Sequence, residues 1–422
     1  FILFHTVSLL TGGILFRETG SWHALMTFSL RAVLLVQFLL LVLPPGAWIP
    51  GMAVLGVASA LYILGWGIIY SLGAREHPAV SIMASVILGA NLILLASTVL
   101  SPYVPPAGLL ILSAVPLVAA GILLQSISKD KQAVLVKPHV RIPVPRGILI
   151  LLPLLALALY LNGGLMYRVM LPALSVSSRF GTYYPFLIYM VVLGVLSRLK
   201  GTVRKAVLVY LGVCLLGLAF IVFALTHHFT SGYLLTIGLM EASFALLDLF
   251  LWSTLGLLSM IYGSPVLLYG LALSANTMGI LLGDRIGAAL LMIGETRYLL
   301  TALVSAASLL LAFIVIPLLV EILEEKKNLV KPSEMEDRGS TDILLPYRLP
   351  GQTLTEREKE VLRLTLLGMT NRDMASELYI SEHTVKTHLK SICGKFGVTR
   401  KKELLLLAAR KDISISGSAD SD

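Results

Sequence analysis

Long apolar runs separated by short polar loops occupy the first 320 residues of the chain. Ten runs reach the roughly 17 residues that an α-helix needs to cross the hydrocarbon core of a bilayer, and a shorter run opens the chain at 1–16. The ten longer runs lie at 24–43, 52–72, 80–100, 107–126, 147–167, 180–197, 206–225, 232–260, 265–293 and 298–320. This pattern predicts an all-α, polytopic membrane bundle in which about eleven helices are present.

The composition agrees with a location in lipid. Only 14% of the residues are charged, and the mean hydropathy of +0.87 is too high for a water-exposed surface. The two cysteines, Cys214 in an apolar run and Cys393 in the polar C-terminal region, are too few for a disulfide framework or a metal site. We therefore expect no metal centre and no cofactor.

Lys and Arg are concentrated in alternate loops. If the segment after residue 320 is cytoplasmic, the inner loops are 17–23, 73–79, 127–146, 198–205 and 261–264. Together they carry eleven basic residues, whereas three of the outer loops carry none: 44–51, 101–106 and 226–231. Because short cytoplasmic loops are enriched in Lys and Arg, we expect the C-terminal segment to lie in the cytoplasm.

By the same parity the first residue lies on the outer side, so we expect one further helix upstream and twelve in the full chain. The most basic inner loop, 127–146, then divides the helices into six and six. This layout resembles the major facilitator architecture, in which two six-helix halves surround a central cavity. The resemblance covers about three quarters of the chain and implies a facilitator-like membrane domain at 1–320. We predict that this domain is the sensor of the protein.

The composition changes abruptly after residue 320. The segment "EILEEKKNLVKPSEMEDRGSTDILLPYRLPGQ" is charged and contains Pro332, Pro346 and Pro350, a composition typical of a linker. We therefore predict a cytoplasmic linker at 321–350. A compact helical domain is predicted at 351–412, followed by a disordered tail at 413–422.

Helix-start signals divide this C-terminal domain into short helices. "TERE" at 355–358 is a capping box, with Thr355 at the N-cap and Glu358 reaching back to it, and "TNRD" at 370–373 repeats the device. Ser381 then caps a third helix, which follows a tight turn at Tyr379 and Ile380. Two short helices joined by such a turn are typical of a helix-turn-helix.

The third helix is predicted to have two distinct faces. Apolar residues recur at spacings of four, three and four and should face the core: Val385, Leu389, Ile392 and Phe396. The opposite face presents Lys386, Thr387 and Lys390, with His383 and Thr384 at the amino end. A helix that enters the DNA major groove needs such an apolar back and short polar or cationic groups in front.

The stretch "LTEREKEVLRLTLLGMTNRDMASELYISEHTVKTHLKSICGKFGVTRKKELL" closely resembles the LuxR-type, or GerE-type, DNA-binding domain of bacterial regulators. The resemblance implies a four-helix domain in which Lys386, Thr387 and Lys390 contact bases and backbone of double-stranded promoter DNA. It also implies that Ala375 lets two helices cross closely and that the last helix, from about Arg400 to Ala409, pairs two copies as a homodimer. A helical adaptor with a merely solvated basic face remains an alternative, because residues 354–410 hold eleven Lys and Arg against seven Asp and Glu.

Ionisable and polar residues inside the apolar runs are candidates for a ligand or proton site, because charge is costly in lipid. Glu241 and Asp248 are seven residues apart, on one helix face, and Asp284 and Arg285 follow in the next helix. Asn162 lies beside two glycines in "YLNGGLMYR", where a bent backbone would line a cavity and close helix packing explains the glycines equally well. A site for a cationic or zwitterionic small molecule, a proton-responsive cluster and an internal salt-bridge network all remain open.

The sequence therefore predicts a membrane-bound transcriptional regulator of the bacterial cytoplasmic membrane, not an enzyme. Its partners would be promoter DNA, the lipid bilayer and an unidentified small molecule. The alternatives are a facilitator-type transporter whose C-terminal domain is regulatory or vestigial, and a membrane bundle that only anchors the DNA-binding domain.

Overall fold

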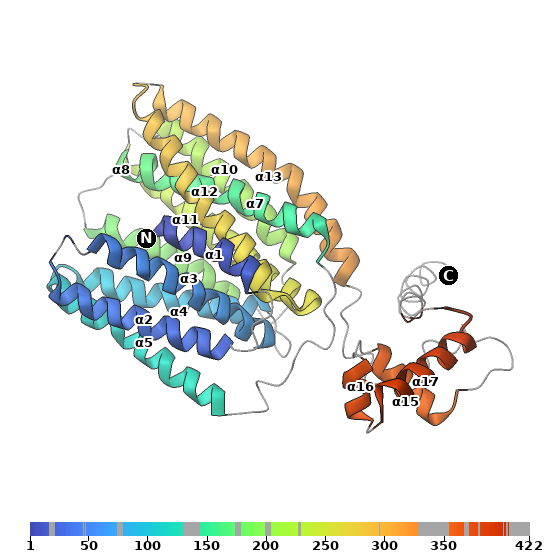
Figure 1. The fold of residues 1–422 in the computed structure, drawn as a ribbon. Coiled ribbons are helices and arrows are strands. Elements are labelled where there is room, and N and C mark those ends of the chain that lie inside the picture. The colour runs from blue at the N-terminus through green and yellow to red at the C-terminus, as the bar shows by residue number, and fades with distance from the viewer. Residues whose placement is uncertain are drawn as a thin grey trace. The chain divides into compact units, whose positions relative to one another are not determined.

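The computed structural model of the protein contains helices and no strand in the part of the chain that it describes, so the predicted all-α class is confirmed (Figure 1). The described residues are 1–16, 22–44, 46, 48–73, 79–129, 144–173, 179–198, 204–226, 229–294, 296–327, 354–366, 371–378, 380–399, 401 and 404. The chain divides into two compact units. The first holds the apolar helices as far as Val320, and the second holds the helices of the C-terminal region.

All eleven predicted apolar runs form helices. The first half of the bundle contains α1 (Ile2–Leu15), α2 (Trp22–Val42), α3 (Trp48–Gly73), α4 (Ala79–Leu100) and α5 (Pro106–Lys129). The second half contains α7 (Arg146–Leu165), the π-helical turn η2 (Met166–Met170), α8 (Leu171–Ala173), α9 (Arg179–Arg198), α10 (Lys205–Thr226), α11 (Thr230–Tyr262), α12 (Pro265–Leu290) and α13 (Arg297–Lys327). Within the described residues, nine helices are long and apolar enough to cross a membrane, and Ile2–Leu15 and Tyr183–Arg198 are shorter apolar helices.

The helices are apolar on the outside of the bundle as well as inside it. Phe28, Phe38 and Leu225 are 68%, 60% and 72% exposed, which suits contact with lipid and not with water. A hydrocarbon solvent offers no partner to a backbone N–H or C=O group, so such a chain must satisfy these groups within helices. The apolar runs therefore fold as helices over most of their length.

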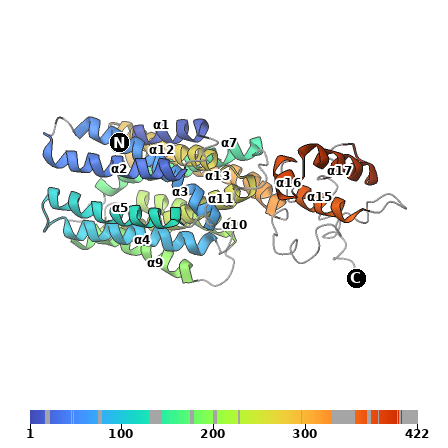
Figure 2. The ribbon, with the colours of Figure 1, turned by 60° about the horizontal axis from the view of Figure 1, so that its bottom comes forward.

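The two halves meet along several helix pairs, which include α3 with α12, α3 with α11 and α4 with α11. Helix α1 of the first half packs against α12 of the second, and α4 packs against α9. Figure 2 shows α1, α2 and α12 together on one side of the bundle and α4, α5 and α9 on the other. Within the halves, α3 packs against both α1 and α2, α7 packs against α12, and α10 packs against α11. Helix α12 therefore contacts both halves of the bundle.

Glycines allow α12 to approach its neighbours closely. A Cβ on Gly283 would lie 2.0 Å from the carbonyl oxygen of Leu161 in α7, and a Cβ on Gly270 would lie 2.5 Å from the Cα of Gly13 in α1. Small residues at helix crossings permit such backbone contact in membranes. The same reason explains Gly164, where a Cβ would lie 2.2 Å from the carbonyl oxygen of Ile280.

The C-terminal unit contains α15 (Glu356–Leu366), α16 (Asn371–Glu377) and α17 (Glu382–Lys395). Its buried core includes the four positions of the third helix that the periodicity predicts, Val385, Leu389, Ile392 and Phe396, and also contains Val361, Leu362 and Leu364 of α15. The predicted caps at Thr355 and Ser381 are both formed. Glu358 Oε2 accepts a hydrogen bond from the Thr355 N–H at 2.8 Å, and Ser381 Oγ accepts one from the Thr384 N–H at 3.0 Å.

Several predicted features of this unit lie outside the described residues. They are Thr370 of the second capping box, Tyr379 of the turn, most of the segment from 400 to 409, and the tail at 413–422.

Replacing Gly283 by alanine should loosen the contact between α12 and α7, because the added Cβ has no room beside Leu161. We expect Gly283→Ala to lower the free energy of unfolding by about 1–3 kcal/mol, measured by thermal unfolding of the purified full-length protein. Gly89→Ala in α4 is the matched control, since nothing lies within 4 Å of a Cβ at that position. Equal melting temperatures for the two variants would contradict the close-packing explanation.

Candidate DNA-binding surface and membrane cavity

Helix α17 has the two faces that its sequence predicts. Its apolar side is buried in the core of the C-terminal unit. His383, Lys386, Thr387 and Lys390 are exposed on the remaining surface, and Thr384 is half-buried. The helix therefore offers two cations and several short polar groups to a partner while its other face anchors it.

A buried carboxylate fixes α17 relative to α15. Glu358 is 4% exposed and accepts hydrogen bonds from Lys395 Nζ and Ser391 Oγ, each at 2.6 Å, in addition to its cap contact with Thr355. Burial by itself would raise the pKa of Glu358, but the hydrogen bonds from Lys395, Ser391 and Thr355 outweigh it and lower the pKa to about 2. The sequence identifies Glu358 only as a cap, because its partners on α17 lie more than thirty residues further along the chain.

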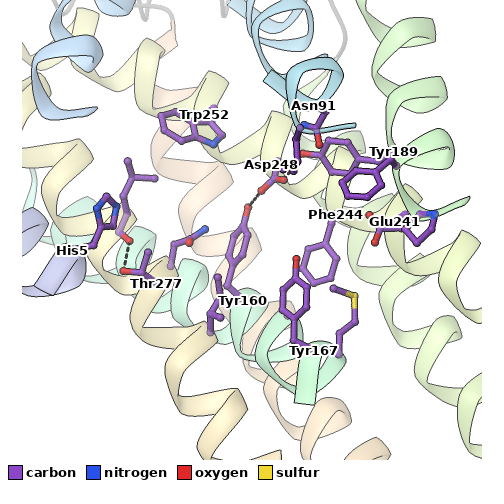
Figure 3. Close-up of a pocket in the computed structure, with 18 of the residues that line it drawn as sticks. His5, Asn91, Tyr160, Tyr167, Tyr189, Glu241, Phe244, Asp248, Trp252 and Thr277 are labelled. Atoms are coloured by element: carbon purple, nitrogen blue, oxygen red, sulfur yellow. Dashed lines mark hydrogen bonds between the residues drawn. The ribbon is translucent and has the colours of Figure 1, made fainter. Parts of the chain in front are cut away.

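The membrane bundle encloses a cavity of about 660 Å³ between its two halves. The walls come from α1, α3 and α4 on one side and from α7, η2, α8, α9, α11 and α12 on the other. Figure 3 shows side chains from several of these helices directed into this space. Its polar lining consists of His5, Asn91, Tyr160, Tyr167, Tyr189, Glu241, Asp248, Asn276 and Thr277.

Glu241 and Asp248 both line this cavity. Asp248 accepts hydrogen bonds from two tyrosines, a very short one from the Tyr160 hydroxyl at Oδ1 and one of 2.5 Å from the Tyr189 hydroxyl at Oδ2 (Figure 3). Tyr160 lies on α7 and Tyr189 on α9, so the carboxylate joins three helices of the second half.

The other three candidates for the ligand site lie elsewhere. Asp284 and Arg285 are not among the cavity-lining residues. Asp284 lies near the C-terminal end of α12, where its carboxylate oxygens are 3.9 Å from Nε of Arg168 and of Arg285. Asn162 is fully buried and donates to Ser308 Oγ at 2.9 Å, which ties α7 to α13. The predicted five-residue cluster is therefore divided among three places.

The glycines beside Asn162 have different surroundings. Gly163 lines the cavity, and Gly164 packs against α12. The backbone leaves the α-helical pattern at η2, which brings Met166 and Tyr167 into the cavity wall. Such π-turns inside helices often occur at functional sites.

Aromatic side chains join the two halves next to the cavity. Trp252, a lining residue on α11, contacts the Trp66 ring of α3 edge to face at 5.5 Å between centroids and lies 5.8 Å from the Tyr269 ring of α12. Trp66 also stacks on Tyr70 at 5.3 Å. A displacement of Trp252 at the cavity wall would therefore also move the ring contacts that join the two halves.

Sequence reasoning missed most of the cavity wall, including Tyr160, Tyr189, Trp252 and His5. An aromatic or histidine in an apolar run gives no signal of which helix face it occupies. No group of three His, Cys, Asp or Glu able to hold a metal occurs in the part of the chain that the structure describes.

Comparisons with known proteins assign the two units to known folds. Residues 352–408 match the family described as GerE, bacterial regulatory proteins of the luxR family. The chain is 36% identical over 85 residues to the transcriptional regulatory protein DegU of Brevibacillus brevis, covering 20% of this chain and 36% of that protein. It is 38% identical over 65 residues to the transcriptional regulatory protein LiaR of Bacillus subtilis (strain 168), covering 15% and 31%.

The membrane unit resembles a solved transporter. The structure of the human organic anion transporter MFSD10 (TETRAN) superposes with a TM-score of 0.59 at 16% identity, covering 74% of this chain and 81% of that one.

The C-terminal region is therefore a LuxR-type helix-turn-helix domain, which implies DNA binding, and the membrane region has a major facilitator fold. Neither fold points to an enzyme. The chain spans about a third of DegU and of LiaR.

The Glu358 contacts should make the stability of the C-terminal unit depend on pH. Because the folded-state pKa is lowered from 4.5 to about 2, this stabilisation is present above pH 4.5 and is lost as the pH falls towards 2. At neutral pH, Glu358→Gln should destabilise the unit by about 1–3 kcal/mol. Hydrogen exchange of residues 356–395 in the full-length protein measures this change. Glu356→Gln is the control, since that side chain is 86% exposed; similar exchange in both variants would contradict the assignment.

Removing one tyrosine hydroxyl should weaken the packing around Asp248. Tyr189→Phe leaves one carboxylate oxygen without its donor, and we expect a loss of about 1–3 kcal/mol in unfolding free energy, measured by thermal unfolding of the purified protein. Tyr167→Phe serves as the control, because the Tyr167 hydroxyl forms no hydrogen bond with a described residue. A larger loss in the control would refute the role assigned to Tyr189.

Proposed function

We propose that this protein is a bacterial membrane-bound transcriptional regulator that binds promoter DNA through its C-terminal domain and senses a small molecule through its membrane domain. The observation that carries the first part is the geometry of α17. A helix with a buried apolar back presents Lys386, Thr387 and Lys390 on its exposed side, within a domain of LuxR type.

Each of these residues has a chemical role at DNA. The ammonium groups of Lys386 and Lys390 neutralise phosphates or donate to guanine. Thr387, with Thr384 and His383 at the amino end of the helix, supplies short donors and acceptors for phosphates and base edges. Two copies pair through the segment from about 400 to 409, so that two α17 helices contact two half-sites.

The domains are organised as a membrane sensor at 1–320, a linker at 321–350, the DNA-binding domain at 351–412 and a tail at 413–422. This order is supported by the division of the chain into two compact units near Val320. The basic inner loops support a cytoplasmic C-terminal domain in the bacterial inner membrane. DNA and the tethered domain then share one compartment.

The sensing site in this proposal is the cavity between the two halves. A ligand can change the output only if it binds two states of the bundle with different affinity. Because the cavity is lined by both halves, a ligand there contacts surfaces that shift relative to each other in such a change. The linker then alters how readily two DNA-binding domains pair.

The second candidate is a transporter whose C-terminal domain regulates it or is vestigial. The major facilitator fold and the central cavity favour this candidate. Its expectation is net flux in vesicles that is lost when Asp248 or Glu241 is neutralised and survives removal of 324–422. MFSD10 is an organic anion transporter, and the two carboxylates in this cavity argue against the same substrate class here.

Genome-wide DNA occupancy of the full-length protein in its host tests the proposal. We expect discrete binding sites, and we expect them to vanish in the Lys386→Ala, Lys390→Ala double variant, because lost phosphate contacts lower affinity by about tenfold or more. Lys359→Ala is the matched control, since this lysine lies on α15 and pairs with Glu356 at 2.7 Å.

The outcomes separate the candidates. Sites that persist in the control and disappear in the double variant support the regulator. An absence of specific sites under varied growth conditions would overturn it and favour the transporter or a helical adaptor.

A further inference from the structure

The charges that line the membrane cavity are of one sign. Glu241 and Asp248 contribute two carboxylates, and no Lys or Arg occurs among the described lining residues. His5 is the one basic side chain in that lining, and its Nδ1 lies 2.8 Å from Ser59 Oγ and 3.2 Å from the Gly56 carbonyl oxygen of α3. An anionic ligand would therefore find repulsion and no fixed cation in this space.

The two carboxylates differ in their hydrogen-bond partners. Each oxygen of Asp248 accepts a tyrosine hydroxyl, from Tyr160 and Tyr189. Glu241 forms neither a hydrogen bond nor an ion pair with a described residue. Seven residues of helix separate the two, about 10 Å along α11. Asp248 therefore orients two rings of the wall, and Glu241 is the carboxylate available to a ligand.

Aromatic rings surround these carboxylates. Tyr160, Tyr167, Tyr189, Phe186, Phe244 and Trp252 all line the cavity. In the view of Figure 3 the rings of Tyr167 and Phe244 are drawn between Glu241 and Tyr160. The face of an aromatic ring attracts a cation, most strongly where water is excluded. Leu9, Ile63, Leu94 and Met166 complete the wall with apolar surface.

We propose that the cavity binds a monovalent organic cation with an apolar, ring-bearing body, and that Glu241 is its counter-ion. The proposal deepens the sensing role given above and rests on it for any effect on transcription. Asp248 is held by two tyrosine hydroxyls, so Glu241 is the lining carboxylate that can pair directly with a cationic group, and we assign the ligand one such group. The volume of about 660 Å³ suits a drug-sized molecule, and the rings bind a delocalised or alkylated cation better than a small hydrated one.

Two probes of the same shape and opposite charge test this inference. Tetraphenylphosphonium and tetraphenylborate are titrated separately into the purified full-length protein in lipid nanodiscs, and binding is followed by calorimetry. We expect saturable binding of the phosphonium and none of the borate. Binding that is equal for the two ions, or an absence of saturable phosphonium binding, would overturn the proposal.

Variants at Glu241 separate charge pairing from partition into lipid. Glu241→Gln should weaken phosphonium binding by about tenfold or more, whereas Glu241→Asp keeps the charge and should retain most of the affinity. Asp284→Asn is the matched control, because that carboxylate lies on the same bundle outside the cavity lining. Unchanged affinity in Glu241→Gln would exclude Glu241 as the counter-ion. Rescue by Glu241→Asp shows that the loss in Glu241→Gln is not a failure to fold.

The phosphonium titration tests the cation site, and the occupancy experiment tests the regulator, so each proposal can be refuted without the other. Discrete promoter sites together with an absence of phosphonium binding would leave the regulator standing and remove the cation class. Phosphonium binding that depends on Glu241, in a protein that occupies no promoter, would establish the cation site and overturn the regulator.

Discussion

In hydrocarbon a polar group without a partner costs several kcal/mol, and the membrane region is organised around this cost. The cost makes every apolar run a helix, because a helix satisfies its own backbone. It also explains why Asp248 is held by two tyrosine hydroxyls and why Asn162 donates to Ser308 across a helix interface. Glu241 has no such partner among the described residues, although its carboxylate lines the cavity. A cationic ligand would supply that partner.

Helix α12 connects this local chemistry to the architecture. Its glycines allow backbone contact with α1 of one half and α7 of the other, and its middle residues Leu273, Asn276 and Thr277 line the cavity. The Thr277 hydroxyl also accepts a hydrogen bond of 2.7 Å from Thr6 on α1. A ligand that moves α12 therefore acts on the contact between the halves, which is the change that a facilitator fold makes available to a sensor or to a transporter.

In the C-terminal domain, a buried carboxylate fixes the orientation of α17. A small helical unit needs a defined relation between its recognition helix and its support, and apolar packing alone leaves some freedom of rotation. The buried carboxylate of Glu358 removes that freedom by bonding to Ser391 and Lys395 on α17 and to the backbone of Thr355. Charge-assisted hydrogen bonds of this kind are directional, so they set the orientation of the face that carries Lys386 and Lys390.

The sequence by itself determined the helices and the two faces of α17. These features follow from local periodicity, from helix caps such as Thr355 and Ser381, and from the length of apolar runs, none of which needs a distant residue. Only the tertiary structure decided which polar residues share a site. Glu241 and Asp248 share one helix, so their spacing alone placed them on one face. Tyr160, Tyr189 and His5 come from three other helices. Asp284 lies beside Arg168, and Asn162 donates to Ser308, both outside the cavity lining. Which residues share the cavity depends on how helices far apart in sequence pack, including the close glycine contacts of α12 with α1 and α7, and no local pattern records this packing.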